Sequence, residues 1–311
     1  MRFLLTVVTL ISLCATSTLS AAEKTKHVLL LGIDGCRFDA LTKANTPNLD
    51  KLISRGIYSP TALIQGERYR KSDTVSGPGW SSINTGVWAD KHGVIDNGFG
   101  KPNFEKYPHF FHYVKLSQPE AKTVSIVDWT PIEKYIVSSA DVSIDTTEYK
   151  KSVVEQYDIA DEKGVNDAIR LLDEVHPTAL MLYQGIVDES GHTFGFHPTV
   201  PEYISAIEKV DQRVGKVLEA IEKQTDEEWL IVVTSDHGGA GKGHGGGHTN
   251  PDIMHSFLIV SGAGAEQGKF DQQVYIVDAV PTLLSYLGIA IDDQWELDGH
   301  VVGLKQKPAT P

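Results

Sequence analysis

The sequence predicts an α/β protein with a doubly wound, mostly parallel sheet and helices on both faces. Its apolar, β-rich runs are continuous rather than alternating, as expected for strands that are buried on both faces. Stretches with apolar residues three and four positions apart lie between some of these runs, and strands that alternate with helices favour a parallel sheet. The predicted strands cover 27–33, 123–129, 179–186, 229–235 and 255–262.

The first half of the chain contains two of these strands and a long irregular section. The run HVLLLGI at 27–33 is the first predicted strand. The section from about 56 to 122 has weak periodicity and many glycine, proline and aromatic residues. We expect this section to be loop-rich and to lie near the active site, because functional residues gather on loops. The run TVSIVDW at 123–129 then restores the strand pattern.

The second half of the chain contains the predicted helices. The stretches 164–175 and 201–223 repeat apolar residues at helical spacing. Pro201 stands where a first helical residue tolerates proline, since that position needs no amide hydrogen bond. The stretch 278–288 is predicted as a last helix that closes at Gly288.

The N-terminus resembles a secretory signal peptide. Arg2 supplies a positive start, residues 3–13 are mostly apolar, and small residues follow as far as SAAE. The apolar run is shorter than the roughly 20 residues of a membrane-spanning helix. We therefore expect a signal peptide at 1–22, a single domain at 23–311 without a transmembrane anchor, and an exported protein that is periplasmic or secreted.

Cysteine content and charge restrict the chemistry further. The two cysteines are Cys14 and Cys36, and Cys14 would leave with the signal peptide, so no internal disulfide is expected. The formal net charge is −13, which argues against binding to nucleic-acid polymers, since these require clustered Lys and Arg. Most of this acidity is explained by a solvated surface, and part of it by metal ligands.

Metal-ligating side chains follow three of the predicted strands. Ligands of open parallel sheets bind beyond the carboxyl ends of the strands, so the residues at these ends are the informative ones. Taken singly, each has an ordinary explanation as a helix N-cap, a solvated pair or a loop residue. Together they form a ligand set suited to zinc or a similar divalent ion. The set comprises Asp34, Asp188, His192, Asp236, His237 and either His244 or His248.

The glycine-rich stretch SDHGGAGKGHGGGHTN at 235–250 superficially resembles a phosphate-binding loop. The pattern fails, because Asp236 stands where the first glycine of that motif belongs and Gly243 stands where Ser or Thr belongs. We interpret these glycines instead as residues that let the backbone turn tightly beside a metal and leave room for a substrate.

A hydroxyl-rich segment, DTVSGPGWSSINTGVWADKHGVIDN at 73–97, resembles the nucleophile region of the alkaline phosphatase superfamily. The similarity is greatest to its nucleotide pyrophosphatase/phosphodiesterase (type I phosphodiesterase) and phosphonoacetate hydrolase branches. The matching residues, all in register, are Ser76, Pro78, the TG at 85–86, the HG at 92–93 and the DN at 96–97. Thr74 is an alternative nucleophile, but it would put the Pro and Gly out of register.

This resemblance runs from Asp34 to about Gly262 and implies an alkaline-phosphatase-like catalytic domain with two zinc ions. Asn97 matches the family's asparagine that contacts a phosphoryl oxygen. Trp80, Tyr69 or Phe99 could line a slot for a second ester group. The resemblance assigns Asp34, Ser76, Asp236 and His237 to one ion and Asp188, His192 and His244 to the other, with His244 preferred to His248.

The implied function is hydrolysis of small phosphate esters, with phosphodiesters or nucleotide pyrophosphates favoured, through a phosphoseryl intermediate on Ser76. A phosphonoacetate-type hydrolase and a phosphomonoesterase are alternatives that use the same ligands. A sulfatase is a weaker rival, because Trp80 stands where the sulfatase motif has Arg. A metal-binding module without turnover would explain the ligands but not the in-register Ser76 and Asn97.

Overall fold

The computed structural model describes residues 24–66, 71–147 and 152–306. Within these ranges an eight-stranded sheet crosses the molecule, in the order β4-β3-β5-β1-β6-β7-β2-β8. All five predicted strands are present in it. The strands are β1 (Thr25–Ile33), β2 (Ile57–Leu63), β3 (Thr123–Val127), β4 (Val142–Asp145), β5 (Ala179–Gln184), β6 (Glu227–Thr234), β7 (His255–Gly262) and β8 (Gly268–Lys269).

The sheet is mostly parallel, as predicted. Strands β4, β3, β5, β1 and β6 run in one direction, and β1 pairs with β5 on one side and β6 on the other. Strand β7 is antiparallel to both β6 and β2. Because β5, β1 and β6 are parallel neighbours, their carboxyl ends lie at the same edge of the sheet.

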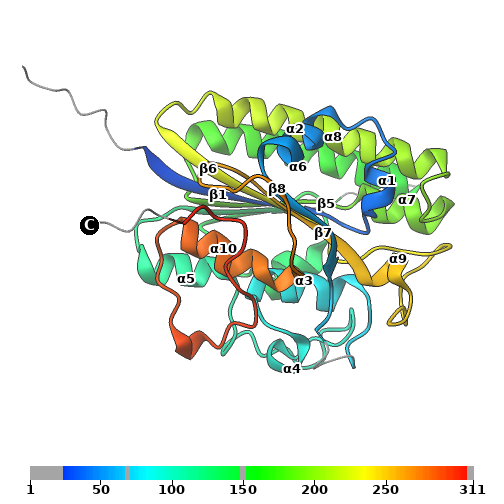
Figure 1. Ribbon diagram of the computed structural model, residues 1–311, viewed down its shortest axis with the longest axis horizontal. Coiled ribbons are helices and arrows are strands. Elements are labelled where there is room, and N and C mark those ends of the chain that lie inside the picture. The colour runs from blue at the N-terminus through cyan, green and yellow to red at the C-terminus, as the bar shows by residue number, and fades with distance from the viewer. Residues whose placement is uncertain (1–23, 67–70, 148–151, 307–311) are drawn as a thin grey trace, which may run out of the picture.

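Helices cover both faces of the sheet (Figure 1), which confirms the predicted doubly wound arrangement. A short helix, α9 (Pro251–Met254), precedes β7. One face carries α1 (Phe38–Leu41), α2 (Pro47–Arg55), α6 (Val153–Glu174), α7 (Ile186–Phe194) and α8 (Pro201–Glu222). The opposite face carries α3 (Ser76–Thr85), α4 (Ala89–His92), α5 (Phe110–Ser117) and α10 (Ala279–Tyr286).

Strand β1 shows how the sequence divides the interior into two cores. Successive side chains of a strand point to opposite faces. Val28 and Leu30 therefore join the core beneath α3, α5 and α10, whereas Leu29 and Leu31 join the core beneath α6 and α8. All four are at most 1% exposed, and burial of each such side chain stabilises the fold by about 1.5–3 kcal/mol. The continuous apolar run is required because both faces are covered.

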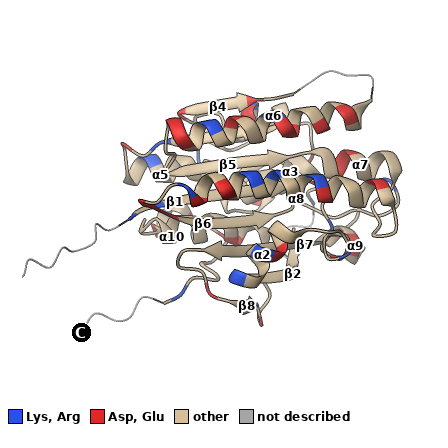
Figure 2. Ribbon diagram, turned by 90° about the horizontal axis from the view of Figure 1, so that it is seen from above, with Lys and Arg blue, Asp and Glu red and all other residues tan. Residues whose placement is uncertain are grey.

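The two long helices α6 and α8 lie side by side over the sheet and carry interspersed charges (Figure 2). Buried Arg213 on α8 joins them, because its guanidinium forms ion pairs with Asp158, Asp161 and Glu162 of α6. These contacts fix α6 against α8 on the face opposite α3.

Two predicted helix boundaries are confirmed and one is wrong. Helix α8 begins with Pro201 at its first turn, and the chain leaves α10 through Gly288, whose φ of +79° favours glycine. Helix α6, however, starts eleven residues before the predicted 164, at Val153. Its N-cap is Ser152, whose side chain accepts a hydrogen bond from the Glu155 amide. A serine followed three positions later by a glutamate is the sequence signature of such a helix start.

Section 56–122 is loop-rich, as predicted, because more than half of its described residues lie outside helices and strands, but it also contains β2 and helices α3, α4 and α5, which were not predicted. Helix α3 has no polar face to produce a periodic pattern, since all of its ten residues are buried. Strand β2 has a register shift between Ser59 and Ala62, around Pro60, and proline is tolerated in a sheet at such irregularities. The predicted strand 179–186 also ends early, at Gln184, and Ile186 begins α7.

Two expectations about cysteine and the membrane can be compared with the structure. Cys36 is buried and is not disulfide-bonded; the sequence analysis predicted no internal disulfide. In the part of the chain that the structure describes, no helix is both long and apolar enough to cross a bilayer. The predicted signal peptide at 1–22, with Cys14, lies outside the described residues.

Candidate metal centre and active site

The three predicted strand ends meet at one edge of the sheet. Asp34 directly follows β1, Asp188 lies in the first turn of α7 after β5, and Asp236 follows β6 after one residue. Since β5, β1 and β6 are adjacent, the three carboxylates come together although residues 34 and 236 lie at distant positions in the chain. All three carboxylates are buried.

Asp34, Asp236 and His237 form the first group of ligand atoms. One ligand atom from each lies within 4.8 Å of the others. The Nε2 atom of His237 lies 3.2 Å from Asp236 Oδ2 and 3.6 Å from Asp34 Oδ1. Ser76 Oγ lies 3.3 Å from the same Nε2. The predicted nucleophile therefore borders this group.

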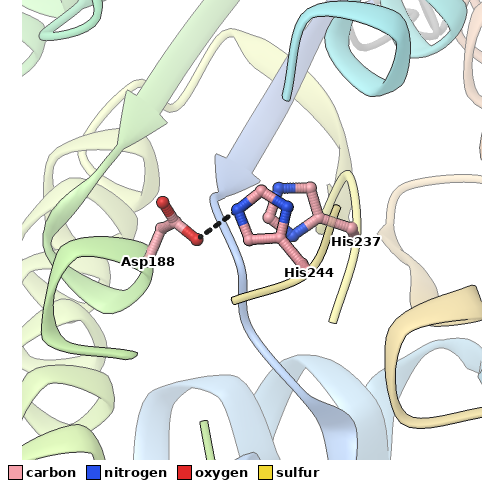
Figure 3. Close-up of side chains that lie close together, drawn as sticks. All are labelled: Asp188, His237 and His244. Carbon is pink, nitrogen blue, oxygen red and sulfur yellow. Dashed lines mark ion pairs between the residues drawn. The ribbon is translucent and has the colours of Figure 1, made fainter. Parts of the chain in front are cut away.

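Asp188, His237 and His244 form the second group (Figure 3), with ligand atoms again within 4.8 Å of one another. Asp188 Oδ1 lies 3.6 Å from His244 Nε2, and the rings of His237 and His244 are stacked with centroids 3.7 Å apart. His192 Nε2 lies 3.3 Å from Asp188 Oδ2 and 3.0 Å from His244 Nε2. His237 thus stands between two groups, whereas the resemblance assigns it to only one.

Backbone carbonyls orient the three histidines. The Nδ1 atoms of His192, His237 and His244 lie 2.8–3.0 Å from the carbonyl oxygens of Lys242, Gly238 and Thr74, respectively. A carbonyl oxygen only accepts hydrogen bonds, so each Nδ1 must carry the proton. The lone pair of each neutral ring is then on Nε2, which faces the carboxylates, as in metal-ligating histidines.

Five buried carboxylate oxygens have no hydrogen-bond partner in the described residues, and three of them belong to this centre: Asp34 Oδ1, Asp188 Oδ1 and Asp236 Oδ2. The other two are those of Asp128, whose pKa burial and the neighbouring Asp161 raise well above its usual range. An ionised carboxylate without a compensating partner is costly in a buried position. A divalent cation bound among these oxygens and the Nε2 atoms would remove that cost. The residues present therefore fit metal ions of the kind that favour mixed carboxylate and imidazole ligands.

The pKa values of these groups agree with a crowded acidic site. Burial, together with the neighbouring carboxylates, raises the pKa of Asp34 and, more strongly, that of Asp236. Burial also acts on Asp188, but the hydrogen bond that the protonated His192 donates through Nε2 and the nearby histidine charges outweigh it and lower the pKa of Asp188. The same hydrogen bond raises the pKa of His192 to about 9. Protons and metal ions would therefore compete for these ligands.

Ser76 is the first residue of α3 and lines a pocket of about 370 Å³ beside both groups. The positive end of the helix dipole at this position favours negative charge on a bound ligand. Thr74, the alternative nucleophile, is fully buried, and its hydroxyl bonds the backbone at His244 and Gly247. Of the two hydroxyls, only that of Ser76 faces the pocket.

Asn97 lies on the pocket wall next to Ser76. Its Oδ1 accepts a hydrogen bond of 2.6 Å from the amide of Gly77, the residue after Ser76. A Cβ at position 77 would stand only 2.9 Å from this oxygen and 2.7 Å from the carbonyl oxygen of Asp96. Glycine at position 77 therefore permits the close approach that positions Asn97.

Trp80, predicted to contact substrate, is instead fully buried beneath the pocket. Its indole Nε1 donates a 2.8 Å hydrogen bond to Asp34 Oδ2. One helical turn separates it from Ser76, and the side chain packs inward instead of lining a slot. Phe99 is also buried and stacks on Tyr135 with centroids 4.8 Å apart, and Tyr69 lies outside the described residues.

The structure distinguishes His244 from His248. His244 belongs to the second ligand group, whereas His248 Nδ1 lies 3.0 Å from Gln65 Oε1. The glycines between β6 and α9 allow this loop to pack tightly, since a Cβ at Gly239 would stand 2.2 Å from the Phe196 ring. Because α9 is a four-residue helix that begins only at Pro251, the loop does not lead into a helix as a phosphate-binding loop would.

The sequence analysis missed several residues of the site. Trp129, Tyr157 and Glu189 line the pocket beside Ser76, and Tyr183 donates a 2.6 Å hydrogen bond to Asp34 Oδ2. Tyr183 stands inside an apolar strand, and a buried tyrosine hydroxyl needs a hydrogen-bond partner. The need of a buried hydroxyl for a partner could therefore have drawn attention to Tyr183. Trp129, Tyr157 and Glu189 reach the pocket through long-range packing, which no local sequence pattern indicates.

The fold and the paired Asp/His groups beside a serine match the arrangement of the alkaline phosphatase superfamily. The family model described as type I phosphodiesterase / nucleotide pyrophosphatase matches residues 28–242. The chain belongs to this family. The matched range includes Ser76 and every predicted metal ligand except His244.

Similarity to individual relatives is lower. An uncharacterized pyrophosphatase/phosphodiesterase of Schizosaccharomyces pombe is 27% identical over 228 residues, which cover 68% of this chain and 44% of the relative. Ectonucleotide pyrophosphatase/phosphodiesterase family member 7 of Rattus norvegicus is 24% identical, with 72% of this chain and 52% of the relative covered. The chain thus spans about half the length of these curated relatives.

Solved structures share the fold. Murine ectonucleotide pyrophosphatase/phosphodiesterase 5 superposes with a TM-score of 0.64 at 16% identity and covers 85% of this chain and 95% of its own. A 2-O GAG sulfatase superposes with a TM-score of 0.69 at 16% identity, over 93% of this chain and 76% of the sulfatase. At 16% identity these two matches show a shared fold and nothing more. The fold therefore does not distinguish a phosphodiesterase from a sulfatase.

Proposed function

We propose that this protein is a two-zinc hydrolase of small phosphate esters, with phosphodiesters or nucleotide pyrophosphates as its substrates. The observation that carries the proposal is the placement of three unpartnered buried carboxylate oxygens and three Nε2 atoms around the Ser76 hydroxyl. One zinc would be held by Asp34, Ser76, Asp236 and His237, and the other by Asp188, His192 and His244. His237 also borders the second group.

Ser76 is the proposed nucleophile. Zinc ions, when bound, would lower the pKa of the serine hydroxyl and offset the charge on the phosphoryl oxygens. Ser76 Oγ would then form a bond to phosphorus while the ester P–O bond breaks, and the leaving oxygen would take up a proton. Water would subsequently cleave the Oγ–P bond of the phosphoseryl intermediate and release phosphate or its monoester.

The surrounding chain would stabilise this displacement without moving. The N-terminus of α3 places the positive end of the helix dipole at Ser76. Asn97 is anchored through Oδ1 to Gly77 and lines the pocket, so its amide N–H groups would be the donors to phosphoryl oxygens. Preorganised donors of this kind lower the barrier because they need no rearrangement during reaction.

The rival functions differ in what they leave unexplained. A phosphonoacetate-type hydrolase or a phosphomonoesterase would use the same ligands and nucleophile. A sulfatase would need Arg where Trp80 stands, and that side chain is buried on Asp34. A metal-binding module would not need Ser76 at the pocket or Asn97 beside it.

The preference for diesters is supported by family membership and by room for a second ester group. The pocket extends from Ser76 to Trp129 and Tyr157, whose rings could contact an organic substituent. An inactive threonine-to-alanine variant of murine ectonucleotide pyrophosphatase/phosphodiesterase 5 has been solved in complex with AMP. We further propose that residues 23–311 form one catalytic domain that is exported to the periplasm or secreted.

The test is hydrolysis of bis-p-nitrophenyl phosphate and p-nitrophenyl phosphate by the zinc-loaded protein. A higher kcat/KM for the diester is expected. A preference for the monoester would keep the nucleophile but replace the substrate class. Inactivity toward both esters, with two zinc ions bound, would contradict the proposal and direct attention to phosphonates and then to sulfate esters.

A further inference from the structure

Two hydrogen-bond donors hold one oxygen of Asp34. Tyr183 Oη donates to Asp34 Oδ2 over 2.6 Å, and Trp80 Nε1 donates to the same oxygen over 2.8 Å. A carboxylate oxygen offers about two lone-pair positions, so both positions of Oδ2 are occupied. The other oxygen, Oδ1, has no hydrogen-bond partner in the described chain and lies 3.6 Å from His237 Nε2.

The two donors form a preorganised pair. Their rings meet edge to face with centroids 5.1 Å apart and an interplanar angle of 73°, a favoured aromatic geometry. Trp80 is 0% exposed and Tyr183 is 4% exposed. Water therefore has little access to replace either hydrogen bond. The carboxylate can change its orientation only if this aromatic pair moves.

Strand β1 has a glycine that makes room for this arrangement. Gly32 pairs with Tyr183 in the sheet, and a Cβ at position 32 would stand 2.3 Å from the Trp80 ring. The indole therefore lies directly against the backbone of β1, two residues before Asp34. Any larger residue at position 32 would displace the ring that donates to Asp34.

Trp80 also links this carboxylate to the nucleophile. Ser76 and Trp80 lie four positions apart on α3, and residues at this spacing share a helix face. The hydrogen bond from Trp80 therefore sets the position of Asp34 relative to Ser76 Oγ. Through Tyr183 the same carboxylate is tied to β5, the strand that leads to Asp188.

From this geometry we infer that Trp80 and Tyr183 are positioning residues that reserve Asp34 Oδ2 and leave Oδ1 as the single oxygen for a metal ion. They act on the ligand and do not touch the substrate. The inference rests on the metal centre of the proposed function. Loss of such outer contacts lowers metal affinity by about 10- to 100-fold in comparable sites.

The test compares zinc binding by Tyr183→Phe, Trp80→Phe and the double variant with that of the unaltered protein. Competition with a chromophoric chelator measures zinc affinity, and the visible spectrum of the cobalt(II)-loaded protein reports the ligand geometry. We expect each single variant to lose about 10- to 100-fold in zinc affinity and to change the cobalt spectrum. The two losses should not add, because both donors act on one atom.

Matched controls remove the same kinds of hydrogen bond far from the centre. Tyr286→Phe removes a bond of 2.9 Å to the Glu228 carbonyl oxygen, and Trp229→Phe removes one of 2.7 Å to Glu227. Both controls should bind zinc as the unaltered protein does. Thermal unfolding of every metal-free variant establishes that it is folded, and Tyr183→Phe keeps the ring, so it tests the inference even if Trp80→Phe does not fold.

The possible outcomes separate this inference from the proposed function. Unchanged zinc affinity and an unchanged cobalt spectrum in Tyr183→Phe would overturn the positioning role while the metal centre stands. Equal losses in the control variants would also overturn it. A protein that binds no zinc before any substitution would overturn both the positioning role and the proposed metal centre.

Discussion

Two regions of this molecule bury aspartate side chains in opposite ways. Asp211 on α8 is fully buried beside the start of α2 and accepts hydrogen bonds from the amides of Asn48 and Leu49 and from the Asn48 side chain. At the edge of β1, β5 and β6, by contrast, Asp34, Asp188 and Asp236 each have a buried oxygen without a partner in the described residues.

The difference lies in the partners and not in the burial. The hydrogen bonds of Asp211 stabilise the first turn of α2 against the middle of α8, and nothing in its surroundings requires a ligand. The three aspartates of the centre are arranged so that only a cation or protons could satisfy them together. Unpartnered oxygens that gather on three carboxylates beside histidine Nε2 atoms therefore mark a candidate metal centre better than burial alone.

The largest expected effect comes from removing the nucleophile at the edge of the centre. Ser76→Ala should lower kcat for bis-p-nitrophenyl phosphate by about 10³-fold or more, because among the described residues no other serine or threonine lines the pocket. Stopped and initial-rate assays on zinc-loaded protein would measure it. If Ser76→Ala retained activity while Thr74→Ala lost it, the nucleophile would be Thr74.

Metal removal sharpens the comparison between the two regions. Chelation should destabilise the protein by about 4 kcal/mol for each zinc ion that is held at a thousandfold excess over its dissociation constant. Urea unfolding with and without zinc would measure the difference. Asp236→Asn should abolish the share of one ion, because the variant lacks one of that ion's ligands. An equal zinc effect in Asp236→Asn would place the stabilising ion elsewhere.

A buried histidine outside the centre, His92, has a hydrogen-bond partner at each of its two ring nitrogens. His92 Nε2 lies 3.0 Å from Ser82 Oγ, its Nδ1 accepts from the Val94 amide, and burial lowers its pKa to about 3. The unfolded chain binds a proton below pH 6.5, whereas the folded one does not until about pH 3. Folding stability should therefore fall as the pH drops through this window.

The expected loss from His92 is roughly 2–3 kcal/mol over the first two pH units below 6.5. Urea unfolding of metal-free protein across that range would measure it, with His92→Gln as the comparison. The variant should show a shallower pH dependence. An identical slope in both proteins would exclude His92 as a contributor and leave His109, whose pKa burial lowers to about 4.

The smallest expected effect is at the satisfied carboxylate. Asp211→Ala should lower the free energy of unfolding by about 1–3 kcal/mol, because the amides of Asn48 and Leu49 lose their acceptor. This loss should be the same with and without zinc. A zinc-dependent effect at Asp211 would mean that the two regions are coupled, which would break the distinction between them.

The sequence predicts the strands around the centre and most of the centre itself because both depend on local signals, whereas β2, β4 and β8 were not predicted. Continuous apolar runs mark buried strands, and the residues directly after β1, β5 and β6 converge once the strands are parallel. His244 and His248, by contrast, differ only in where a glycine-rich loop carries them. They can be told apart only in the structure, where His248 contacts Gln65, a residue distant in sequence, and lies outside the ligand groups.

Trp80 shows what sequence reasoning could not supply. From the sequence, a tryptophan four positions after the nucleophile could either line a substrate slot or be buried beneath the site. Trp80 is buried because Gly32, 48 positions earlier in the chain, leaves space for its ring. Helix α3 escaped prediction for a related reason, since a helix buried on every side has no polar face to reveal its period. Long-range packing decides both cases.

The most direct test of the central claim is the metal content of the protein measured by elemental analysis, with hydrolysis of bis-p-nitrophenyl phosphate followed as the metal-stripped protein is titrated with zinc. The account predicts two zinc ions per chain and activity that rises with their occupancy. A stripped and a zinc-saturated protein with equal activity, or a chain that binds no zinc, would contradict it.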